Sequence, residues 1–173
     1  MAALATIRKV LDKFLMTLSV ALFVVMVVVG TYQICTRYFF GHPSTISEEL
    51  LTYSFTWMAL CASAYVFGKR DHMRMAFIAD KIKGKPKQIL DIGIEVLIMA
   101  FALLALVWGG FSIMMLSMHQ QTASLGIPMG YVYTVLPVSG ICIVIYAILN
   151  IVDMLHGKDL YLKNGIEEKG DIA

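Results

Sequence analysis

The residues best able to do chemistry in this sequence gather in one short polar segment between two apolar stretches. This segment contains Arg37 and the adjacent glutamates Glu48 and Glu49. The spacing Thr45-x-x-Glu48 is typical of a capping box, in which the glutamate closes the first turn of a helix. The carboxylates also suit the positive end of that helix, and one of them could form an ion pair with Arg37 or present charge to a partner. These interpretations are compatible, and they predict a helix that starts near Ser47 beside a candidate contact site.

Elsewhere the sequence offers no residue set for catalysis or for a metal or cofactor. The four histidines lie outside the apolar stretches, so a haem held between facing helices is not expected. The three cysteines form no CxxC motif. No nucleophile–base pair, glycine-rich phosphate loop or HExxH motif occurs. We therefore expect a protein that is not an enzyme, with no catalytic, cofactor-binding or metal-binding residue.

The elements that must position the polar segment are long, uncharged and apolar. The chain has 173 residues, of which 59% are hydrophobic and 15% charged, and its mean hydropathy is +0.77. A soluble domain averages roughly 25% charged residues, so this composition argues against a water-soluble fold. Four stretches contain no Asp, Glu, Lys or Arg: Phe14–Thr36, Leu50–Gly68, Val96–Met118 and Tyr131–Val152. Each has 19 to 23 residues, close to the ~20 that a helix needs to cross the hydrocarbon core.

These stretches predict an all-α integral membrane protein with one four-helix membrane domain over residues 1–155. We expect its transmembrane helices at about 14–36, 47–68, 89–118 and 130–152, followed by a tail over 156–173. Short amphipathic helices are expected at the membrane interface, over residues 4–13 and within the loop 69–87.

The basic residues predict the orientation of the chain. With both ends inside, 13 of the 14 Lys and Arg residues fall on the cytoplasmic side, and Arg37 alone falls outside. Because Lys and Arg prefer cytoplasmic flanks, both termini and the tail are predicted to be cytoplasmic.

Small residues mark the predicted packing faces, because small side chains spaced four apart let helix backbones approach closely in lipid. Such pairs are Ala59 with Ser63, Ala64 with Gly68, and Ala105 with Gly109. In the last span, Pro137 with Gly140 predicts a kink. No Asp, Glu, Lys, Arg or His lies in the core of any span, so the chain alone offers no proton relay or ion pathway.

The order of motifs along the chain is similar to that of one known family. The motifs are Arg37-Tyr38-x-Phe40 after the first span, Glu48-Glu49-Leu50 at the second, and Pro128-x-x-Tyr131-x-Tyr133-x-x-x-Pro137-x-x-Gly140 at the fourth. Over about residues 10–155, the chain resembles the small membrane subunit (DctQ type) of tripartite ATP-independent periplasmic, or TRAP, transporters.

That resemblance implies a non-catalytic subunit of a sodium-coupled transporter for an organic anion, such as sialic acid or a C4-dicarboxylate. Its implied setting is the bacterial inner membrane, among lipids and without nucleic acid. The implied protein partners are a large multi-span membrane subunit that moves as an elevator and a periplasmic substrate-binding protein. At the matching loop positions Arg37, Glu48 and Glu49, the resemblance implies a docking or bracing role.

Two other classes of function are open from the residues alone. A self-contained small homo-oligomeric carrier or channel is favoured by Gly109, Gly110 and the Pro137 kink, and it would produce flux in liposomes that contain only this chain. A membrane-embedded enzyme would depend on a single essential polar residue, and the sequence nominates none.

Overall fold

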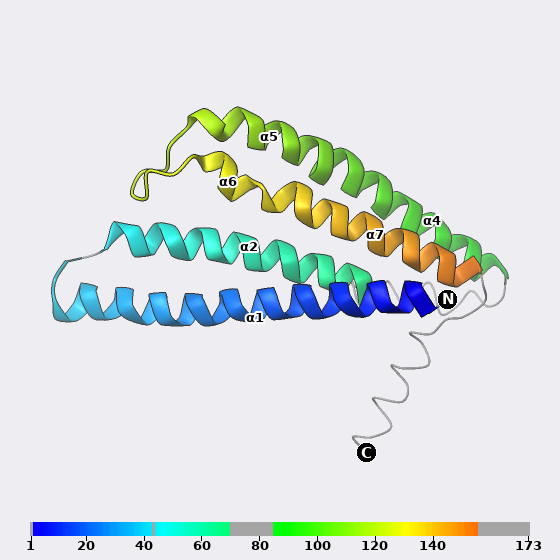
Figure 1. Ribbon diagram of the computed structural model, residues 1–173, viewed down its shortest axis with the longest axis horizontal. Helices are drawn as coiled ribbons and strands as arrows, with labels where there is room; N and C mark the ends of the chain where they lie inside the picture. The colour runs from blue at the N-terminus through cyan, green and yellow to red at the C-terminus, as the bar shows by residue number, and fades with distance from the viewer. Residues whose placement is uncertain (1, 43, 70–84, 156–173) are drawn as a thin grey trace, which may run out of the picture.

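A computed structural model describes residues 2–42, 44–69 and 85–155, which are helical over most of their length (Figure 1). The first two long helices are α1, Ala2–Phe39, and α2, Thr45–Lys69. The third has four parts: α4, Lys85–Phe101; the π-helix η1, Ala102–Gly109; α5, Gly110–Leu116; and the 3-10 turn η2, Ser117–His119. The fourth consists of α6, Met129–Tyr133, and α7, Val135–Leu155.

Within the described ranges, four stretches of helix are long and apolar enough to cross a membrane: Thr6–Phe39, Thr45–Lys69, Leu90–His119 and Met129–Met154. The predicted fold class, all-α with four membrane-spanning helices, is confirmed. The helices run beyond the charge-free stretches, so charged residues enter them at their ends. Residues 70–84 and 156–173 lie outside the described residues, and the amphipathic helix and the tail predicted there stay predictions.

The four spans lie in a row rather than around a common axis (Figure 1). α1 contacts mainly α2, α2 contacts α7, and α7 contacts α4 and η1. Half of the apolar window of the fourth span is buried inside the chain, against 6% for the first span and 11% for the third. α7 is therefore interior to the row, whereas α1 and the third helix form its two edges.

The row has two ends, which we name by what they carry. The loop end carries the connection from α1 to α2 and the connection from η2 to α6. The terminal end carries the start of α1, the start of α4 and the last turn of α7 (Figure 1).

Glycines let the helices approach α7 directly. A Cβ atom on Gly68 of α2 would lie 2.6 Å from the Tyr146 ring, and one on Gly110 would lie 2.7 Å from Leu136 Cβ. A Cβ on Gly140 would lie 2.7 Å from the Cβ of a leucine in η1. The buried core around these contacts comprises Leu15, Cys61, Ala64, Ala102, Val135, Cys142, Ile143 and Tyr146. Close backbone approach thus replaces bulky side chains along the centre of the row.

The small residues predicted to form packing faces take different positions. Ala64 is fully buried and Gly68 lies against Tyr146, so this pair packs within the chain. The other pairs are less covered: Ser63 and Ala105 are exposed, and Ala59 and Gly109 are half-buried. Close packing at these four residues requires another polypeptide, and it stays a prediction.

The N-terminal segment differs from the sequence prediction. Residues 4–13 do not form a separate interfacial helix, because α1 is continuous from Ala2 to Phe39. Arg8 is buried there, with polar partners on α7. The segment is therefore the first part of α1 and belongs to the row.

The third and fourth helices depart from regular α geometry. In the third, the Gly110 N–H donates to the Ala105 carbonyl, the wide hydrogen bond of a π-helix. In the fourth, α6 ends at Tyr133 and α7 begins at Val135, so the break falls three residues before Pro137. Proline has no N–H to donate to the carbonyl four residues earlier, and its ring crowds that carbonyl, which accounts for the break.

Candidate functional site

At the loop end, α2 begins earlier than the predicted capping box. The Ser44 Oγ accepts a hydrogen bond from the Ser47 N–H at 3.4 Å, and the Ser44 carbonyl accepts one from the Glu48 N–H at 3.3 Å. Ser44 is thus the cap, which suits serine because its short side chain reaches the third N–H of the helix. The predicted capping box of Thr45 and Glu48 is wrong, because the cap is Ser44. Glu48 is exposed in the first turn of α2, where its charge suits the positive end of the helix, as predicted.

Glu49 binds the other connection at the loop end. Its Oε1 accepts a hydrogen bond from the Tyr53 hydroxyl at 2.5 Å. Its Oε2 accepts the backbone N–H groups of Ser124 and Leu125, both at 2.9 Å. Hydrogen bonds to a carboxylate are stronger than those between neutral groups, so Glu49 anchors the connection between η2 and α6 to α2.

The anchored connection is also held by hydrogen bonds between its own residues. The Thr122 N–H donates to the Ile127 carbonyl at 2.9 Å, and the Thr122 Oγ1 accepts the Ile127 N–H at 3.1 Å. Gly126 adopts a φ of +66°, which places it in the left-handed region that glycine enters without strain. Residues 122–127 therefore form a defined turn, which we call the anchored loop.

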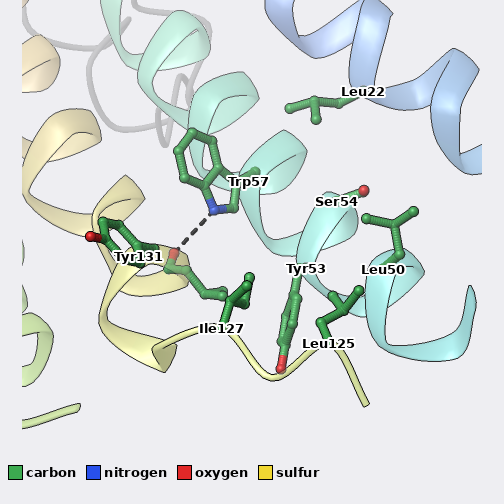
Figure 2. A pocket seen from close by; sticks show the side chains of 9 residues that line it. Leu22, Leu50, Tyr53, Ser54, Trp57, Leu125, Ile127 and Tyr131 are labelled. Atoms are coloured by element: carbon green, nitrogen blue, oxygen red, sulfur yellow. Dashed lines mark hydrogen bonds between the residues drawn. The ribbon is translucent and has the colours of Figure 1, made fainter. Parts of the chain in front are cut away.

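A shallow, open pocket of about 260 Å³ lies beside the anchored loop, between α1, α2 and α6 (Figure 2). Its lining is mostly apolar and comprises Leu22, Leu50, Tyr53, Ser54, Trp57, Leu125, Ile127, Tyr131 and Val132. Trp57 donates its indole N–H to the Val132 carbonyl at 3.0 Å, as the dashed line in Figure 2 marks. This bond holds α6 on α2 directly before the helix break at Thr134.

Arg37 does not form the ion pair that the sequence suggested. It is exposed near the end of α1, and within the described ranges no salt bridge joins it to Glu48 or Glu49. The Glu49 carboxylate is occupied by the anchored loop instead. The loop end therefore presents Arg37 and Glu48 as exposed charges of opposite sign.

A buried polar network, which sequence reasoning missed, joins three helices at the terminal end. The Arg8 Nη2 donates to the Asn150 Oδ1 at 2.8 Å and lies 3.0 Å from an Asp153 carboxylate oxygen. The Asn150 Nδ2 donates to the Glu95 Oε1 at 3.1 Å. Because polar groups at membrane depth need partners, this network stabilises the ends of α1, α4 and α7 against one another.

Tyr146 of α7 brings α2 into the same region. Its ring lies against Gly68 of α2, and its hydroxyl donates to the Asp12 Oδ1 at 2.5 Å. The sequence did contain a signal, because Arg8 and Asp12 lie one turn apart and therefore face the same side of a helix. A search limited to charge-free stretches could not use it.

Comparison with known proteins decides the family. The family model for tripartite ATP-independent periplasmic transporters, DctQ component, matches residues 26–157. The chain belongs to the DctQ family.

Three relatives of this DctQ chain are named as small permeases. It is 27% identical over 157 residues to the sialic acid TRAP transporter small permease protein SiaQ of Vibrio cholerae serotype O1, covering 89% of this chain and 90% of that protein. It is 25% identical over 140 residues to a putative TRAP transporter small permease protein of Haemophilus influenzae, covering 81% and 84%. A second such protein of Haemophilus influenzae is 22% identical over 133 residues, covering 77% and 82%.

Family membership establishes the general function of the DctQ chain. It is a small permease subunit of a TRAP transporter, which is a transport component and not an enzyme. Its four apolar helices and its family make it a multi-pass bacterial membrane protein that associates with other TRAP components. The family suggested by the motif order is confirmed.

Proposed function

We propose that this DctQ chain is the static subunit of a sodium-coupled transporter for organic anions. In this proposal it braces a large, elevator-type membrane subunit and helps to dock a periplasmic substrate-binding protein. The observation that carries the proposal is the distribution of charge. The middle of the spans consists of the stretches Phe14–Thr36, Leu50–Gly68, Val96–Met118 and Tyr131–Val152, which contain no Asp, Glu, Lys, Arg or His. Ionisable groups within spans usually mark ion pathways, so their absence supports passage of the substrate and its coupling ion through another polypeptide.

The contacts at both ends of the row support a static role. At the loop end, Glu49 and Trp57 hold the anchored loop and α6 on α2. At the terminal end, the network around Arg8 and Tyr146 connects all four helices. Helices held at both ends resist sliding past one another, and a subunit beside a moving partner has to keep its own shape.

The orientation proposed for this brace has the terminal end in the cytoplasm and the loop end in the periplasm, across the inner membrane. The distribution of basic residues supports it, because Arg37 is the single basic residue of the loop end. In a variant whose three native cysteines are replaced, His42→Cys should react in intact cells with a maleimide that cannot cross the inner membrane. Lys163→Cys should react only after lysis, and the reverse result would contradict the orientation.

The docking role falls to the exposed charges of the loop end. Arg37 and Glu48 are accessible to a soluble partner, whereas Glu49 acts by holding the anchored loop beside them. Charges at the rim of an interface mainly set how fast partners associate. Docking at this end is therefore expected to depend on ionic strength.

In this proposal the partner subunits bind the substrate, so its class is inferred from a relative of this chain. The Vibrio cholerae relative is named for sialic acid, so we propose sialic acid as the first candidate substrate and a C4-dicarboxylate as the second. Both are organic acid anions.

The deciding experiment reconstitutes this chain in liposomes with the large membrane subunit and the binding protein of the same transporter. Uptake of labelled sialic acid or succinate under a sodium gradient is expected only when all three proteins are present. Uptake that persists when this chain is omitted would contradict the bracing role. Flux through liposomes that contain this chain alone would favour the self-contained carrier instead.

A further inference from the structure

One polar group of the third helix faces outward near the middle of its span. Trp108 lies in η1 and is 71% exposed. Among the residues that the structure describes, no acceptor is found for its indole N–H. The span ends at His119, so Trp108 lies about 16 Å along the helix from the loop end. The hydrocarbon core is about 30 Å thick, which places the indole near its middle.

This position is unusual for tryptophan in a membrane protein. Tryptophan prefers the headgroup level, where its N–H meets water or lipid headgroups. Acyl chains contain no hydrogen-bond acceptor, so lipid at mid-depth leaves the N–H unsatisfied. The other tryptophan of the chain, Trp57, has an acceptor at 3.0 Å in the Val132 carbonyl. Trp108 therefore requires an acceptor from outside the part of the chain that the structure describes.

The surroundings of Trp108 leave room for such an acceptor. Ala105 is exposed, and a Cβ on Gly109 would meet nothing closer than a carbonyl of its own helix at 3.5 Å. On the other side of the helix, Gly110 at the start of α5 packs against α7, since a Cβ added there would lie 2.7 Å from Leu136 Cβ. The wide turn is thus packed on one side and open on the other. A π-helix of this kind frequently occurs at functional sites.

At the opposite edge of the row, the exposed side chains of α1 differ from those around Trp108. The exposed residues of α1 between Val20 and Val28 carry only hydrocarbon side chains, among them Phe23, Val24, Val27 and Val28. Thr31, nearer the loop end, satisfies its hydroxyl on the Val27 carbonyl of the same helix at 2.7 Å. The part of α1 from Val20 to Val28 therefore exposes no side chain that needs a hydrogen-bond partner.

We propose that a helix of the large membrane subunit packs on the indole face, defined as Phe101, Leu104, Ala105, Trp108 and Gly109. Trp108 donates its N–H to a carbonyl or hydroxyl oxygen of that helix. The small residues allow its backbone to come close, and the hydrogen bond sets its depth in the membrane. Lipid covers α1. This inference rests on the proposed function and adds the surface through which the brace is attached.

Photo-crosslinking in the intact membrane complex tests the assignment. A photoreactive residue replaces Leu104 on the indole face and, as the matched control, Val24 on α1. We expect Leu104 to crosslink to the large subunit and Val24 to give no crosslink to it. Crosslinking from Val24 alone, crosslinking from Leu104 only to a second copy of this chain, or no crosslink from either position would overturn the proposal.

Substitutions test the contribution of the hydrogen bond and of the open side. Trp108→Phe keeps the ring and removes the donor, and we expect about threefold weaker association with the large subunit in competition with the unaltered chain. Gly109→Leu fills the open side, and we expect association to be lost. Phe23→Leu on α1 is the control, with unchanged association. Gel filtration in detergent checks that each variant remains folded.

The outcomes separate this inference from the proposed function. If the unaltered chain does not co-purify with the large subunit, the bracing role itself fails. If it does co-purify and both indole-face variants associate normally, only the assignment of this face fails.

Discussion

The contact between Gly68 and Tyr146 makes a sharp prediction about the centre of the row. Gly68→Ala places a Cβ 2.6 Å from two carbons of the Tyr146 ring, whereas carbon atoms pack at about 3.5–4.0 Å. The ring cannot easily move aside, because Tyr146 is 1% exposed and its hydroxyl is held by Asp12. We therefore expect α2 to be pushed away from α7.

The expected magnitude combines two opposing effects. Overpacking a core costs about 1–3 kcal/mol, while replacing glycine by alanine within a helix regains about 0.5–1 kcal/mol. The net loss in the free energy of unfolding is then about 1–2 kcal/mol. For a chain of this size, that lowers the midpoint of thermal unfolding by about 2–8 °C.

The assay is thermal unfolding followed by circular dichroism in a mild detergent. Gly93→Ala is the matched control, because a Cβ on Gly93 of α4 would meet nothing within 4 Å, and its midpoint should stay the same or rise. In a Tyr146→Phe background the ring loses its hydroxyl anchor, so Gly68→Ala should cost less there. If Gly68→Ala is as stable as Gly93→Ala, close approach at Gly68 does not hold α2 on α7.

Three further predictions concern the two ends of the row. Arg8→Met should lower the free energy of unfolding by about 1–3 kcal/mol, less than for a fully buried pair because the Asp153 side chain is 32% exposed. The charge swap Arg8→Asp with Asp153→Arg should recover part of that loss in the same thermal assay. Glu49→Gln should loosen the anchored loop, seen as faster hydrogen exchange at its backbone N–H groups, and unchanged exchange would argue against the anchor. Glu48→Lys should slow uptake at low binding-protein concentration without changing the unfolding midpoint, and Arg37→Ala should act in the same direction, whereas normal uptake in both would place docking elsewhere.

The spans could be predicted from the sequence because lipid imposes a simple rule on composition. Segments such as Phe14–Thr36 lack charge, and a lipid-facing helix cannot easily carry it. The true helices are longer, as α1 from Ala2 to Phe39 shows. The difference arises because Arg8 finds Asn150 and Asp153 on another helix, and no single stretch of sequence reveals such a partner.

The candidate site was predicted in part, for reasons that lie in local geometry. The sequence drew attention to Glu48 and Glu49 correctly as a pair at a helix start, but two adjacent residues point in different directions. Starting the helix after Ser44 leaves Glu48 exposed and turns Glu49 toward Ser124, which is 75 residues away in the chain. The loop that packs against α2 thus decides which glutamate is free to meet a partner, and the local sequence does not reveal that loop contact.

The wide turn at Ala102–Gly109 also has a consequence for how the third helix can change over evolution. Loss of one residue there tightens the wide turn into ordinary α-helical winding, because its i→i−5 hydrogen bonds become i→i−4 bonds, and the flanking halves keep nearly the same faces. The segment still crosses the bilayer and presents the same side to its neighbour. Relatives can therefore lose a residue at this position without rebuilding the span or its contact.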